Sequence, residues 1–311
     1  MEFYNFLYLI MTRQKQDNLQ SYGLKPLDFN GKQQIDTGFT RRDFMMTSLA
    51  LGFALASQPI LAQAISTNTE GLIAGEVKIP VADGSIPAYQ AMPAQGANFP
   101  VILVIQEIFG VHEHIKDMCR RYAKMGYLAI APELFARQGD VSKMTDISEI
   151  LSTVVSKVPD DQVLADLDAT VAHVKAGKKG NVENLGAVGY CWGGRAVWLY
   201  AAHNSAMKAG VAYYGLLNGM KSDIKANDPI DVASALKVPV LGLYASIDSF
   251  IKADIVEQMQ AELEKSGSKS EIIVFPNVNH GFNADYRPTY NKTAAEYAQK
   301  LANDWFKTHG V

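Results

Sequence analysis

Cys191 stands in a sequence pattern that can make a cysteine nucleophilic. It follows the apolar run 185–188 and precedes the stretch 195–202, whose composition predicts a helix. Gly189 and Gly193 lie two positions before and after it, and small residues there let a strand and a helix approach closely around a strained turn. Such a nucleophile elbow presents its central side chain at the tip of the turn. We therefore expect Cys191 to be a nucleophile; the alternative is a buried cysteine that only packs.

A neutral thiol needs a base, and one histidine is placed to supply it. His280 follows a late apolar run, in a short loop that can reach back over the elbow. Asp248 follows an earlier run and would accept a hydrogen bond from the other imidazole nitrogen, which fixes the tautomer. The order Cys191, Asp248, His280 is the one that such triads have on an α/β sheet. The alternatives are a surface loop histidine at His280 and a helix cap at Asp248.

Acyl transfer also needs N–H groups directed at the developing oxyanion. The expected donors are the backbone amides of Trp192, directly after the nucleophile, and of Ile108, in the loop after an early strand. Glu107 lies at the start of that loop, at the end of an apolar run, which is an unusual place for a charge. We expect it to act in the site, and the alternative is a solvent-facing carboxylate.

Two histidines, His112 and His114, have the spacing of a metal-binding pair. No third ligand stands at helical spacing from them, so we interpret both as residues at the start of a helix and predict no metal site. We also predict no cofactor.

The rest of the chain alternates apolar runs with amphipathic stretches. Continuous apolar strands separated by helices indicate an α/β protein with a mostly parallel central sheet and helices on both faces. Asp83 and Gly84 predict a hairpin that adds a short antiparallel edge. Ligands of such sheets bind at the carboxyl ends of the strands, where the residues above are expected. The runs are 101–105, 127–131, 185–189, 210–214, 238–244 and 271–275.

Residues 1–64 resemble an export signal. Arg41 and Arg42 precede the uncharged run 44–61, and a small-residue motif ends at Ala64. We predict a twin-arginine signal that engages the twin-arginine export machinery, is cleaved after Ala64 and directs the protein to the periplasm without a stable membrane anchor. An uncleaved anchor is the alternative, but the run is interrupted and shorter than the roughly 20 apolar residues that span a bilayer.

The remaining residues, 65–311, are predicted to form one domain. Removing residues 1–64, which carry six basic and five acidic side chains, leaves 23 Lys plus Arg against 27 Asp plus Glu and a net charge of −4. This charge gives no basic surface for nucleic acid. Cys119 and Cys191 are the two cysteines of the sequence, so there is no disulfide framework. A bridge between them would silence the proposed nucleophile.

Four motifs in order resemble the dienelactone hydrolase (carboxymethylenebutenolidase) family, over about residues 72–308. The resemblance implies an α/β-hydrolase fold with a Cys-Asp-His triad at Cys191, Asp248 and His280. It also implies that Glu107 contacts the resting thiol and helps to ionise it when substrate arrives. Arg137 matches a family arginine that binds the substrate carboxylate. The motifs are 106–111, 132–138, 189–194 and 280–282.

The chain departs from the family at a second arginine, four residues after the histidine. Ala284 stands there, and Arg287 three residues later is the substitute that we expect to bind substrate if the loop is rearranged. We predict a hydrolase that opens a lactone or cleaves a small ester through a Cys191 acyl-enzyme. The alternatives are a non-catalytic small-molecule-binding protein of the same fold and a thiol-responsive redox protein that uses Cys119 and Cys191.

Overall fold

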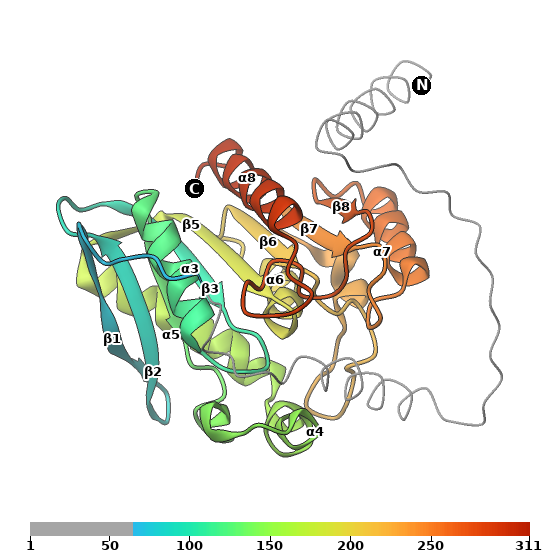
Figure 1. The fold of residues 1–311 in the computed structure, drawn as a ribbon, viewed down its shortest axis with the longest axis horizontal. Coiled ribbons are helices and arrows are strands. Elements are labelled where there is room, and N and C mark those ends of the chain that lie inside the picture. The colour runs from blue at the N-terminus through green and yellow to red at the C-terminus, as the bar shows by residue number, and fades with distance from the viewer. Residues whose placement is uncertain (1–64) are drawn as a thin grey trace.

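An eight-stranded sheet forms the centre of the computed structural model, which describes residues 65–311 (Figure 1). The strand order is β1-β2-β4-β3-β5-β6-β7-β8; β2 pairs antiparallel with both β1 and β4, and the other pairs are parallel. The strands are β1 (Leu72–Val81), β2 (Gly84–Pro93), β3 (Phe99–Ile105), β4 (Leu128–Pro132), β5 (Gly180–Tyr190), β6 (Ala209–Tyr213), β7 (Val240–Ala245) and β8 (Glu271–Phe275).

Helices follow most of the parallel strands, as the alternating pattern predicts. The main helices are α3 (Glu113–Lys124), α5 (Asp160–Gly177), α6 (Trp192–His203), α7 (Ala253–Lys265) and α8 (Lys292–Thr308). A region of short helical turns between β4 and α5 includes α4 (Ile147–Glu149), and another turn covers Pro229–Ala235. Within residues 65–311, no helix combines the length and the apolar character needed to cross a bilayer.

Two consecutive residues of β5 show that helices cover both faces of the sheet. A Cβ at Gly186 would meet the ring of Phe306 in α8. The next residue, Ala187, pairs with Gly210 of β6. A Cβ at Gly210 would meet Val197 of α6. Successive residues of a strand point to opposite faces, so α8 and α6 lie on opposite sides. The predicted α/β fold, with every residue of β4, β6 and β7 buried, is therefore confirmed.

The carboxyl ends of four parallel strands meet at one edge of the sheet. The loop 106–110 follows β3 and Cys191 follows β5, while Asp248 and His280 lie in the loops after β7 and β8. The antiparallel hairpin predicted at Asp83 and Gly84 is also confirmed, since β1 and β2 pair from Val81 and Gly84 outward. The predicted twin-arginine signal and its cleavage site lie outside the described residues.

Candidate active site

Cys191 occupies the strained turn between β5 and α6. Its backbone has φ 54° and ψ −113°, a conformation that L-residues rarely adopt. The flanking glycines make the turn possible: a Cβ at Gly189 would lie 2.1 Å from the carbonyl oxygen of Gly193, and a Cβ at Gly193 would lie 2.4 Å from that of Ile105. The amide of Cys191 donates to the carbonyl of Tyr213 at 3.0 Å. The elbow predicted from the two glycines is therefore the local structure of this segment.

A nucleophile at the tip of an elbow is expected to be exposed, but Cys191 is only 4% exposed. Three side chains from later loops lie near the sulfur. His280, Tyr214 and Arg287 all lie close enough for the charge on the sulfur to influence their pKa values. The sulfur therefore has neighbours from the loops after β6 and β8.

His280 and Asp248 form a buried pair beside Cys191. The His280 Nδ1 lies 2.8 Å from Asp248 Oδ2. Burial opposes protonation of the imidazole, but the charges of Asp248 and of the Cys191 sulfur outweigh it and raise the pKa of His280 to about 10. The surface-histidine interpretation of His280 is therefore wrong. The Asp248 carboxylate also accepts from the amides of Phe250 and Ile251, so it orders its own loop as well as the histidine.

Two aromatic rings hold the imidazole of His280 in place. The ring centroids of Tyr214 and Phe250 each lie 4.9 Å from that of His280, at interplanar angles of 58° and 80°. Tyr214 has a positive φ of 38°, as a residue in a tight turn after β6. Neither aromatic is predicted from sequence, although Tyr214 directly follows β6 and Phe250 lies two residues after Asp248.

Glu107 is completely buried and is held by three side chains. Arg287 Nη2 donates to its Oε1 at 2.9 Å, the Tyr286 hydroxyl donates to its Oε2, and His112 Nε2 lies 3.4 Å from Oε2. Burial alone would raise the pKa of Glu107, yet Arg287 and His112 hold it well below its usual range. Glu107 is thus a fixed negative charge, and the solvent-facing interpretation is wrong. Tyr286, a partner that the sequence analysis misses, directly precedes Arg287.

His112 and His114 begin α3, as predicted. His112 is the N-cap residue, and its ring stacks on that of His114 with centroids 6.1 Å apart. His114 Nδ1 lies 3.0 Å from Oδ1 of Asp285, whose other oxygen, Oδ2, accepts from Arg121. In the described residues, no group of three His, Cys, Asp or Glu side chains is arranged to hold a metal ion. The two rings instead line the buried network around Glu107.

The backbone near the elbow brings the two expected oxyanion donors into neighbouring segments. Trp192 opens α6, and the next residue, Gly193, packs directly against the carbonyls of Ile105 and Gln106 at the end of β3. Ile108 follows two residues later in that loop, and it is buried like Trp192. The first turn of α6 and the loop after β3 are therefore in contact beside Cys191.

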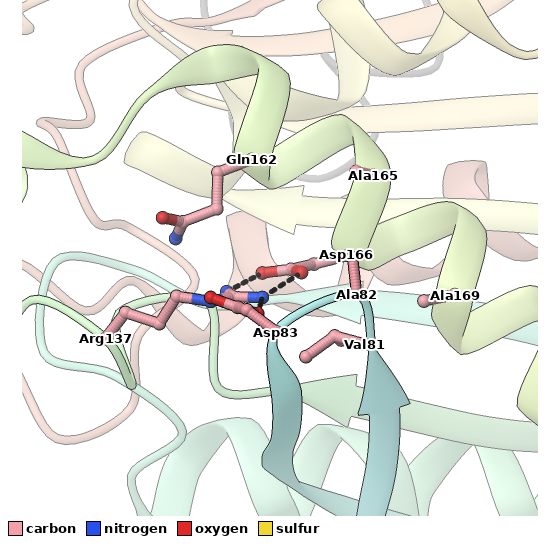
Figure 2. A pocket seen from close by; sticks show the side chains of 8 residues that line it. All are labelled: Val81, Ala82, Asp83, Arg137, Gln162, Ala165, Asp166 and Ala169. Carbon is pink, nitrogen blue, oxygen red and sulfur yellow. Dashed lines mark hydrogen bonds and ion pairs between the residues drawn. The ribbon is translucent and has the colours of Figure 1, made fainter.

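Arg137, expected to bind substrate, makes its contacts at the hairpin end of the sheet. Its guanidinium lies between Asp83, at 2.7 Å, and Asp166 of α5, at 2.7 and 3.0 Å (Figure 2). These side chains line a cleft of about 410 Å³ between the β1–β2 turn and α5. None of the three expected triad residues lines this cleft. The full lining is Val81, Ala82, Asp83, Arg137, Gln162, Ala165, Asp166 and Ala169.

Cys119 and Cys191 are both free and buried. Cys119 lies in α3, and burial raises the pKa of its thiol far above the usual value. The bridge that would silence Cys191 is not formed.

Comparisons with known proteins agree on one family. A model of the dienelactone hydrolase family matches residues 86–310. A Methylorubrum extorquens protein provisionally named a carboxymethylenebutenolidase is 56% identical over 276 residues, which cover 88% of this chain and 95% of that protein. A protein of Escherichia coli K12 with the same provisional name is 48% identical over 267 residues, covering 86% and 98%. A crystal structure from Klebsiella pneumoniae, provisionally named a dienelactone hydrolase, superposes with a TM-score of 0.74 at 48% identity, covering 76% of this chain and 98% of that one. The elbow, the sheet and these matches show that the chain belongs to the dienelactone hydrolase family.

Proposed function

We propose that this enzyme, a lactone or ester hydrolase by family, uses Cys191 as a nucleophile and passes through an acyl-enzyme. The single observation that carries the proposal is the position of His280, with Asp248 on one side of the ring and the Cys191 sulfur close enough to raise its pKa. An imidazolium between a carboxylate and a sulfur favours the thiolate, which is the nucleophilic form of cysteine.

The steps follow from that arrangement. The Cys191 thiolate attacks the carbonyl carbon of the ester or lactone, and the new oxyanion accepts hydrogen bonds from the amides of Trp192 and Ile108. The tetrahedral species collapses to a thioester as the alkoxide leaves with the proton of His280. The neutral His280 then removes a proton from water, which attacks the thioester. This second collapse releases the carboxylic acid and restores the thiolate beside a protonated histidine.

Glu107 is proposed to assist this cycle as a fixed carboxylate. The family resemblance assigns it a contact with the resting thiol, and its burial with Arg287 and Tyr286 supports a constant negative charge at this place. A constant negative charge can orient the resting thiol, whose proton passes to His280 as the thiolate forms. We propose no metal and no cofactor in any of these steps.

Alkylation separates this proposal from a non-catalytic binding protein. An activated Cys191 should react with iodoacetamide well below pH 8 in the folded protein, because a thiolate reacts and a thiol does not. Cys119 is the internal control: burial raises the pKa of its thiol, so it should stay unmodified until denaturant is added. Peptide mass spectrometry assigns the label to one cysteine or the other. Equal protection of both cysteines until unfolding would favour the binding protein.

Residues 1–64 carry a further proposal about location. Arg41 and Arg42, followed by the uncharged run 44–61, support export through the twin-arginine machinery and a periplasmic site of action.

A further inference from the structure

We infer that Tyr214 is a further catalytic residue, whose hydroxyl donates a hydrogen bond to an oxygen of the ester or lactone group; this inference rests on the proposed function. Tyr214 is fully buried, and its hydroxyl has no hydrogen-bond partner among residues 65–311. A buried hydroxyl without a partner costs free energy, and a catalytic role is one of the few reasons for a protein to retain it.

The backbone places Tyr214 directly beside the nucleophile elbow. The preceding residue, Tyr213, ends β6 and accepts the hydrogen bond from the amide of Cys191. The following residue, Gly215, packs against the first turn of α6, where a Cβ on Gly215 would lie 2.4 Å from the backbone carbonyl carbon of Gly194. The loop after β6 is therefore anchored to the elbow on both sides of Tyr214.

The side chain of Tyr214 lies among the reactive groups. Its ring centroid lies 4.9 Å from that of His280. Burial and the charges of Glu107 and Cys191 raise the pKa of the Tyr214 hydroxyl well above its usual value, although Arg287 opposes the shift. These influences indicate that the hydroxyl lies near the thiol, and they keep it protonated. A protonated hydroxyl without a protein partner is a donor for an oxygen of the substrate.

The backbone conformation of Tyr214 is a second, independent observation. Five non-glycine residues of the described chain have a positive φ. Asparagine, which occupies two of these positions, tolerates the left-handed region, and Lys178 is the C-cap of α5. The other two are Cys191 and Tyr214, with φ values of 54° and 38°. A bulky residue in this region is strained, and such strain is retained where it positions a functional side chain.

The Tyr214→Phe variant removes the hydroxyl and retains the ring that packs on His280. We expect kcat/KM for 4-nitrophenyl butyrate to fall about tenfold or more, because one donor to the reacting group is lost. The Tm should stay equal or rise, since a buried polar group without a partner is removed. The pH at which alkylation of Cys191 by iodoacetamide is half-maximal should not change, because thiolate formation depends on His280 and Asp248.

Tyr213 supplies the matched control. It is also fully buried with an unpartnered hydroxyl, but burial and Tyr122 of α3 raise its pKa, without a contribution from Cys191 or Glu107. The Tyr213→Phe variant keeps the backbone carbonyl that holds the Cys191 amide. It should have an equal or higher Tm and the wild-type kcat/KM.

The outcomes separate this inference from the proposed function. Wild-type kcat/KM in Tyr214→Phe, with activity lost in Cys191→Ala, would overturn the role of Tyr214 and leave the cysteine mechanism standing. An equal loss of activity in Tyr213→Phe would overturn it too, as would a lower Tm or a shifted alkylation midpoint in Tyr214→Phe. The hydroxyl would then act on packing or on the thiolate, not on the substrate. Wild-type activity in Cys191→Ala would remove the proposed function and this inference with it.

Discussion

Replacing Cys191 with alanine should lower kcat for ester hydrolysis by about 10⁴-fold or more, since loss of the nucleophile removes the covalent route. The fold should persist, because alanine is smaller than cysteine and the strained turn depends on Gly189 and Gly193 rather than on the sulfur. Circular dichroism and thermal unfolding check the fold, and a 4-nitrophenyl ester assay gives the rate.

Cys119→Ala is the matched control for this substitution. It removes the other buried thiol, in α3, and should keep the wild-type rate at a modest loss of stability. If Cys191→Ala retained a tenth of the wild-type rate, or if Cys119→Ala lost activity to the same degree, Cys191 would not be the nucleophile.

Replacing Arg287 with methionine should destabilise the fold by about 3–5 kcal/mol, because it leaves the fully buried Glu107 without its ion-pair partner. For a chain of this size, that corresponds to a fall of roughly 6–20 °C in Tm. The double variant Glu107→Gln/Arg287→Met should recover part of the loss, since no unpaired charge is left behind. A single variant as stable as the wild type would contradict this role of Arg287.

The loss of thermal stability in Arg287→Met should depend on pH in one direction. In the wild type, the pKa of Glu107 is lowered from 4.5, so its contribution to stability is present above that pH and is lost as the pH falls through the folded value. Without Arg287, burial raises the pKa of Glu107 instead, and protonation then stabilises the fold. The difference in Tm between wild type and Arg287→Met should therefore narrow as the pH falls from 7 toward 5. A constant difference would mean that Glu107 does not carry the charge.

The parts of the site that depend on local backbone rules could be predicted from the sequence. Gly189 and Gly193 lie within two residues of Cys191, and their lack of a side chain is what the tight strand-to-helix turn requires. The Asp248–His280 pair was also predictable, because both residues follow parallel strands whose carboxyl ends meet at one edge.

The partners of the arginines could not be predicted in the same way. Arg137 meets Asp83, 54 positions away, and Arg287 meets Glu107, 180 positions away. Motif spacing shows that an arginine is present, whereas the packing of distant elements decides whether its guanidinium is available. The burial of Cys191 has the same origin, since His280, Tyr214 and Arg287 come from later loops.

The covalent intermediate is the most direct test of the account. The wild-type protein is mixed with excess 4-nitrophenyl butyrate, quenched in acid during the first turnovers and weighed intact by mass spectrometry. We predict an added mass equal to one butyryl group, located on Cys191 by peptide mapping and absent from Cys191→Ala. Rapid release of 4-nitrophenol with slower deacylation makes this species accumulate. Turnover without any acylated protein, or an acyl group on a different side chain, would contradict the cysteine mechanism.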